Sequence, residues 1–153
     1  MSESFRAMKE SGVCPMCESL KNGRIFSDLK DRMFYEDDAM FCFFEEHPRA
    51  VGHAILFVKK HYEDMTYLPD ALCASAFLLA KRVMNVLKYA LGVKKVYLCT
   101  MCDGNVNHFH IQLIPRHPHT EIGSKNFVKP REEHIEDENL LHSVRRMLGY
   151  PTQ

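Results

Sequence analysis

Every second residue is apolar in the sequence NHFHIQLIPR, residues 107–116. A period of two is typical of a β-strand with one buried face. The other face then carries the side chains of His108, His110 and Gln112, spaced about 7 Å apart. Two imidazoles and a carboxamide in a row carry no fixed charge, so they make a poor solvated surface. We therefore interpret this face as part of a functional site.

Hydrophobic patterning also predicts the other elements of the chain. The sequence MFYEDD and the apolar run at residues 39–44 predict a hairpin, and residues 53–58 and 93–99 predict buried strands. Apolar residues at helical spacing predict a long helix that opens at Pro69-Asp70 and ends before Gly92. A short helix with one apolar face is expected over residues 137–148.

These elements predict an α+β fold, with an antiparallel sheet packed against the long helix and the short C-terminal helix. The chain has 153 residues and neither an internal repeat nor a linker-like stretch, which predicts one domain over residues 1–153. Residues 1–30 are polar apart from Cys14-Pro-Met-Cys17. We therefore expect something other than core burial to order this N-terminal segment.

Charge and composition narrow the classes of partner and compartment. The formal net charge is zero, so no overall field would attract nucleic acid or anionic lipid. The N-terminus lacks a signal-peptide core, and no apolar run approaches the ~18 residues of a membrane span. Six cysteines without a secretory signal favour reduced thiols or metal ligands. These features predict a cytoplasmic protein that binds neither nucleic acid nor membrane.

Cys14 and Cys17 form a C-x-x-C motif, whose two thiolates can bind one metal ion. A structural zinc site usually needs four ligands, so two more must come from elsewhere. A second C-x-x-C at Cys99 and Cys102 would complete a four-cysteine site. Histidine donors are the alternative, and the candidates are His47, His53, His61 and His108. A redox role is disfavoured because no strand-then-helix pattern surrounds Cys14 and Cys17.

Three segments of the sequence resemble the histidine triad superfamily. HFHIQLIPR, residues 108–116, resembles its signature strand, which alternates histidines with apolar residues and ends in Pro-Arg. GHAILFVKKH, residues 52–61, resembles its Gly-His-x-Leu-Val-Ile-Pro-Lys-x-His segment. The C-x-x-C at residues 14–17 resembles the zinc-binding version of that fold. The segments occur in the superfamily's order.

The resemblance implies roles for individual residues. His110 corresponds to the nucleophile. The nucleotide-binding positions fall on Glu45 for the ribose, Asn105 for the phosphate, and His53 as a supporting histidine. Glu45 replaces the usual Asp or Asn, and Asn105 replaces Ser or Thr. The ligands of a structural zinc ion correspond to Cys14, Cys17, His61 and His108.

Gln112 departs from ordinary triad hydrolases, which have histidine at this position. His-x-His-x-Gln is similar to galactose-1-phosphate uridylyltransferase and the diadenosine tetraphosphate phosphorylases, which transfer a nucleotidyl group to a phosphate or a sugar phosphate. The resemblance implies a nucleotidyltransferase or nucleotide hydrolase acting on a nucleotide, a nucleotide sugar or a dinucleoside polyphosphate. The amide of Gln112 can donate to a phosphate oxygen without titrating near neutrality. The alternative is that Gln112 only fills space beside His110.

Two other functions remain open at this point. His108 and His110 could jointly bind a catalytic metal in a metallohydrolase. The chain could also be a nucleotide-binding or adaptor module of the same fold without efficient turnover.

The resemblance also implies a homodimer. The expected contact is the long helix together with the strand at residues 93–99, whose free edge would otherwise expose unpaired backbone groups. A monomer whose edge is covered by the C-terminal helix is the alternative.

Overall fold

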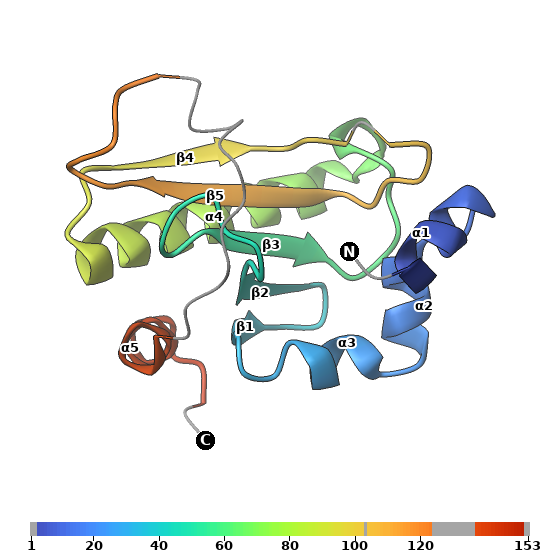
Figure 1. Cartoon of the computed structure of the whole chain (residues 1–153), viewed down its shortest axis with the longest axis horizontal. Helices are drawn as coiled ribbons and strands as arrows, with labels where there is room; N and C mark the ends of the chain where they lie inside the picture. Colours follow the sequence, from blue (N-terminus) through green and yellow to red (C-terminus); the bar gives the residue numbers. More distant parts are fainter. Residues whose placement is uncertain (1–2, 103, 124–136, 152–153) are drawn as a thin grey trace.

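Five antiparallel strands form one sheet in the computed structural model of the chain, which describes residues 3–102, 104–123 and 137–151. The strand order across the sheet is β1-β2-β3-β5-β4 (Figure 1). The strands are β1 (Met33–Glu36), β2 (Met40–Phe44), β3 (Ala54–Val58), β4 (Lys95–Cys99) and β5 (His110–Arg116). The α+β prediction is therefore confirmed, and β5 lies between β3 and the edge strand β4.

The first face of the sheet is covered by α4 (Asp70–Leu91), the long helix that the apolar spacing predicts (Figure 1). The apolar face of α4 packs against apolar residues of β3 and β5. Ile111 and Leu113 of β5, and Phe109 just before it, are fully buried there. The helix ends at Gly92, whose φ of 64° is the left-handed conformation that favours glycine. Of the helices in the described part of the chain, none is long and apolar enough to cross a membrane.

The second face of the sheet is covered over β1, β2 and β3 by two short N-terminal helices, α2 (Pro15–Lys21) and α3 (Arg24–Asp28). They follow α1 (Glu3–Glu10). Ile25 and Leu29 are buried there with Phe41, Phe43 and Phe57. The expectation that the N-terminal segment lacks core burial is therefore wrong. Ile25 lies in the five-residue helix α3 and Leu29 directly follows it, which is too short a segment to give a recognisable period.

His110 and Gln112 lie on this second face, beside the part that α2 and α3 cover. Phe57 and Ile55 of β3 are their partners in the pairing of β3 with β5, and both belong to the buried cluster under the N-terminal helices. His110 and Gln112 therefore lie at the border of that cluster. The loop after β3 passes through the 3-10 helix η1 (Met65–Tyr67) before it reaches α4.

The C-terminal helix α5 (Glu138–Leu148) packs against α4 and β1, at the opposite edge of the sheet from β4 (Figure 1). Asp137 caps its start by accepting the Leu140 N–H at 2.9 Å. Arg145 Nε donates to the Met33 carbonyl at 2.9 Å, and Arg82 donates to the Leu148 carbonyl at 2.6 Å. The alternative in which the C-terminal helix covers the β4 edge is therefore wrong.

We predict that Ile25→Ala lowers the free energy of unfolding by about 2–4 kcal/mol, because it leaves a cavity between α3 and the sheet. Urea denaturation monitored by circular dichroism measures this. Ile122→Ala is the matched control, since Ile122 is 85% exposed and its truncation should leave stability unchanged. Equal effects from the two substitutions would show that α3 is not anchored by this contact.

Candidate functional site

Three separate segments bring four metal-ligating side chains to one end of the sheet. Cys14 is the residue before α2, and Cys17 lies in its first turn. His61 follows β3, and His108 precedes β5. The donor atoms of all four lie within 4.8 Å of one another. Within the described ranges, no other group of three or more Cys, His, Asp or Glu side chains is arranged to hold a metal ion.

The sulfur and nitrogen atoms of this group are spaced as ligands of one ion. Cys14 Sγ lies 3.4 Å from His108 Nδ1, and Cys17 Sγ lies 3.6 Å from the same nitrogen. Cys17 Sγ also lies 3.3 Å from His61 Nδ1. The four side chains could therefore hold a metal ion with two sulfur and two nitrogen ligands.

The main chain fixes the ring of His108 from the opposite side. Its Nε2 donates to the carbonyl of Val58 at 2.8 Å, which leaves Nδ1 unprotonated and directed at the two sulfurs. Burial lowers the pKa of His108 to about 4, so the ring is neutral at pH 7 and keeps the lone pair that a metal needs. The next residue, Phe109, donates its N–H to the Tyr62 carbonyl at 2.7 Å, which ties this segment to the loop carrying His61.

The thiol of Cys17 needs a neighbouring cation to ionise at neutral pH. Partial burial, together with the hydrogen bond and charge of the neighbouring Cys14, raises the pKa of Cys17 to about 11. At pH 7 the thiol form of Cys17 is therefore favoured until a metal ion supplies positive charge. Metal binding at this group releases protons for that reason.

His110 is held by the backbone of the residue two positions before it. Its Nδ1 lies 2.9 Å from the carbonyl oxygen of His108, which can only accept, so Nδ1 carries the proton. In the neutral ring Nε2 then has the free lone pair. The ring is half-buried at the start of β5. This arrangement can present a nucleophilic nitrogen to a ligand on the second face of the sheet.

Gln112 lies against that nitrogen. Its amide Nε2 is 3.4 Å from His110 Nε2, in a position to donate to the lone pair. The side chain is only 4% exposed, and its buried carbonyl oxygen has no hydrogen-bond partner in the part of the chain that the structure describes. A buried acceptor without a partner costs about 1–3 kcal/mol, so an incoming donor next to His110 would be favoured.

Glu45 and His53 lie together at the opposite end of β3. Glu45 follows β2 and donates its N–H to the His53 carbonyl at 2.9 Å. His53 is 1% exposed, and its Nδ1 accepts the Arg49 N–H at 3.1 Å, which braces the β2–β3 loop. The structure therefore places this pair beside the C-terminal half of β5, because Ala54 pairs with Leu113.

The two asparagines before β5 have different surroundings. Asn107 closes a turn on Gly104: its Oδ1 accepts the Gly104 N–H at 2.9 Å, and its Nδ2 donates to the Gly104 carbonyl at 2.8 Å. Asn107 is therefore a turn residue. Asn105 lies within the same turn with its side chain exposed.

Two of the sequence alternatives do not match this geometry. Cys99 pairs with Gln112 across β4 and β5, and neither Cys99 nor Cys102 belongs to the metal-ligating group, so the four-cysteine site is wrong. His110 is also outside that group. A metal held jointly by His108 and His110 therefore has no basis in the described residues.

Sequence reasoning missed Phe57. Its ring centroid lies 4.4 Å from that of His108 and 6.5 Å from that of His110. In the sequence it is one of several apolar residues in a buried strand. Only the register of β3 with β5 brings it beside the two histidines.

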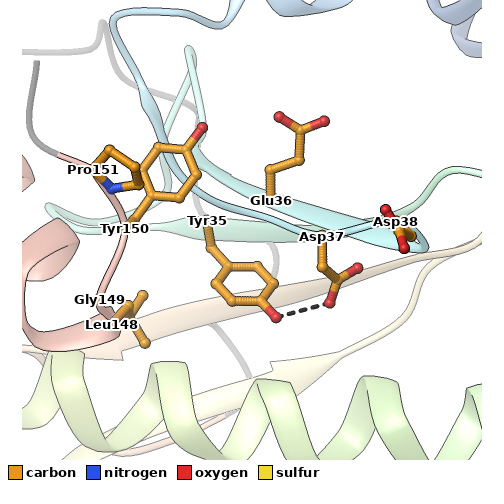
Figure 2. Close-up of a pocket in the computed structure, with 8 residues that line it drawn as sticks. All are labelled: Tyr35, Glu36, Asp37, Asp38, Leu148, Gly149, Tyr150 and Pro151. Carbon is orange, nitrogen blue, oxygen red and sulfur yellow. Dashed lines mark hydrogen bonds between the residues drawn. The ribbon is translucent and has the colours of Figure 1, made fainter.

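A separate hollow of about 410 Å³ lies beside β1, between the β1–β2 turn and the end of α5 (Figure 2). Two of the three carboxylates that line it have structural partners. Asp37 accepts the Tyr35 hydroxyl at 2.7 Å and two backbone N–H groups of the turn, and Glu36 pairs with Lys59 at 2.7 Å. Burial raises the pKa of Tyr35 to about 12. The hollow contains none of the residues that the sequence predicts for the site.

The sequence profile of the HIT domain matches residues 27–119, and the chain therefore belongs to the HIT family. It is 30% identical to an uncharacterized HIT-like protein of Methanocaldococcus jannaschii, over 69% of this chain and 80% of that protein. It is 25% identical to the adenosine 5′-monophosphoramidase of Saccharomyces cerevisiae, over 68% of this chain and 63% of the relative.

Solved structures share the fold. A hypothetical histidine triad nucleotide-binding protein of Sulfolobus tokodaii superposes with a TM-score of 0.67 and 22% identity, over 89% of this chain and 92% of that one. A zinc-bound histidine triad family protein of Mycobacterium smegmatis superposes with a TM-score of 0.63 and 19% identity, over 76% of this chain and 83% of that one.

Proposed function

We propose that the chain is a nucleotidyltransferase or nucleotide hydrolase that works through a nucleotidyl intermediate on His110. The observation that carries the proposal is the 2.9 Å hydrogen bond from His110 Nδ1 to the His108 carbonyl, which leaves Nε2 as the nucleophilic atom. HIT family membership supports the class of reaction. The yeast relative, named as a monophosphoramidase, supports a nucleotide substrate.

The reaction proceeds in two displacements at the α-phosphorus. In the first, the lone pair of His110 Nε2 forms a bond to phosphorus, and the bond from phosphorus to the leaving group breaks with its electron pair going to that group. The imidazole becomes cationic while its Nδ1–H stays bonded to the His108 carbonyl. In the second, an acceptor oxygen attacks phosphorus, the P–N bond breaks, and its electrons return to Nε2.

Gln112 supports the first displacement by hydrogen bonding. Its amide contacts His110 Nε2 at 3.4 Å and would turn to a phosphoryl oxygen when that nitrogen attacks. An amide exchanges no proton near neutrality, whereas a histidine at this position could serve as an acid or base. Acceptors and leaving groups that need no proton transfer from the enzyme, such as phosphates, are therefore favoured over water.

The nucleotide contacts extend from His110 along the second face. We assign the ribose hydroxyls to Glu45 and a phosphate oxygen to Asn105, with His53 bracing the loop that carries Glu45. The substrate is a nucleotide, a nucleotide sugar or a dinucleoside polyphosphate.

The metal at Cys14, Cys17, His61 and His108 is proposed to be a structural zinc ion. With Zn–S about 2.3 Å and Zn–N about 2.0–2.1 Å, a tetrahedral ion needs S···N separations of about 3.6 Å. Three of the S···N separations in the structure are 3.3, 3.4 and 3.6 Å. A closed set of four protein ligands leaves no open position for substrate, so the zinc stabilises the fold and takes no part in the displacements.

A homodimer is proposed through α4 and the free edge of β4. Among the described strands β4 pairs with β5 alone, and α5 lies at the other edge of the sheet. Leu78 and Tyr89 are exposed apolar residues of α4. Exposed apolar side chains and an open strand edge each favour contact with a second copy.

The covalent intermediate gives the first test. Wild-type protein incubated with adenosine 5′-monophosphoramidate, diadenosine polyphosphates and nucleotide sugars should gain the mass of one nucleotidyl group with at least one of them. Intact-protein mass spectrometry under alkaline quench, which preserves a phosphoramidate, measures this. His110→Ala should abolish the adduct, and exposed His142→Ala should retain it. Substrate binding without any adduct in wild type would favour the binding-module alternative.

Gln112→His tests whether Gln112 determines which acceptor receives the nucleotidyl group. We expect this variant to raise hydrolysis relative to transfer, because an imidazole can exchange a proton with water. The substrate carries a label in its α-phosphate, and the measurement is the ratio of labelled hydrolysis product to labelled product formed with added phosphate or sugar phosphate. Equal partition by wild type and variant would mean that Gln112 does not set the acceptor.

The zinc proposal predicts one zinc per chain by elemental analysis. His61→Ala should lose most of the metal because it removes one of four ligands, whereas the double variant Cys99→Ser, Cys102→Ser should keep it. The reverse pattern would contradict the assigned ligands.

The dimer proposal predicts a sedimentation mass twice the 17.8 kDa of the chain at micromolar concentration. Leu78→Glu should shift the mass to the monomer, because it places a charge on the proposed contact. Ile122→Glu, which changes an exposed residue that belongs to neither α4 nor β4, should not. A monomeric wild-type protein would refute the contact.

A further inference from the structure

His108 takes part in two arrangements at once. Its ring directs Nδ1 at the sulfurs of Cys14 and Cys17, and its carbonyl oxygen holds the Nδ1–H of His110. His108 therefore joins the metal-ligating group to the imidazole ring of His110. Any rotation of the His108 backbone moves the carbonyl that sets the tautomer of His110.

Two consecutive residues of β3 restrain His108. The Val58 carbonyl accepts from its Nε2 at 2.8 Å. The Phe57 ring packs against the His108 ring with centroids 4.4 Å apart, tilted by 37°. Phe57 is 4% exposed, so its ring has little room to move.

Phe57 also packs against His110. It is the partner of His110 in the pairing of β3 with β5, and the two rings are nearly parallel, at 17°, with centroids 6.5 Å apart. Among the described aromatic residues, it alone has ring contacts with both histidines.

We propose that Phe57 is a positioning residue that couples the metal centre to His110. The proposal rests on the nucleophilic role of His110 given above. The Phe57 ring limits the rotamers of both imidazoles, so that an ion at the four-ligand group and the Nδ1–H tautomer of His110 stabilise the same position of His108. Removal of the ring lets His108 tilt, which weakens the bond from His110 Nδ1 to its carbonyl.

Through this coupling, the metal centre would affect the tautomer of His110 as well as the stability of the fold. Loading the site with zinc should increase the fraction of His110 in the Nδ1–H tautomer. The effect passes through chain contacts, and zinc itself stays away from the reacting phosphorus.

The test compares Phe57→Leu with Phe34→Leu. Phe34 is fully buried on the other face of the sheet, where its ring packs on Phe44 with centroids 4.8 Å apart. Phe34→Leu therefore also removes a buried ring, but one that has no ring contact with His108 or His110 among the described residues. Long-range ¹H–¹⁵N NMR of the imidazoles reads the tautomer of His110 without any substrate. Phe57→Met provides the same comparison if the leucine variant does not fold.

In zinc-loaded protein we expect wild type and Phe34→Leu to show the Nδ1–H tautomer of His110, and Phe57→Leu to show a mixture. Zinc affinity should fall about tenfold in Phe57→Leu alone, as for other residues that orient metal ligands. Adduct formation with the substrate found above should slow about tenfold with little change in substrate affinity. Chelating the zinc of wild type should produce the same mixture of tautomers.

The same tautomer in both leucine variants, or in loaded and chelated wild type, would overturn the coupling. The NMR result is independent of turnover. A tautomer shift in a protein that forms no adduct would therefore refute the proposed function and leave the coupling intact.

Discussion

The hydrogen bond from His108 Nε2 to the Val58 carbonyl is the constraint on which the site depends. A neutral imidazole has one donor and one acceptor nitrogen, so once Nε2 donates to the main chain, Nδ1 must be the acceptor. That nitrogen lies against the sulfurs of Cys14 and Cys17. The backbone of the same residue then holds His110. His108 thus connects the metal-ligating group with His110.

The two faces of the sheet around β5 are covered differently. On the first face α4 covers β5 and buries Phe109, Ile111 and Leu113 completely. On the second face α2 and α3 extend only over the strands as far as β3. The start of β5 is therefore held from the α4 side, while His110 is half-buried on the second face. The buried carbonyl oxygen of Gln112 has no hydrogen-bond partner among the described residues, and a donor from a substrate would relieve its desolvation.

The long elements follow from the sequence because their patterns are long. Alternation over residues 107–116 and the helical stripe from Asp70 to Leu91 predict β5 and α4 from neighbouring residues alone. Ile25 and Leu29 escape prediction because α3 has five residues and shows no period. The strand itself is shorter than its alternation, since pairing starts at His110, and His108 and Phe109 are held by the β3 strand end and the following loop.

The sequence by itself determined which side chains share a face and which family's motifs they resemble, because both depend on short spacings. Only the tertiary structure decided which donors meet at the metal-ligating group. Cys14 and His108 are 94 positions apart, and a chelating set with Cys99 and Cys102 is equally possible from spacing alone. The register of β3 with β5 and the docking of α2 select His61 and His108. The same register also brings Phe57 beside His108 and His110. Such contacts depend on the packing of distant segments, which local periodicity does not encode.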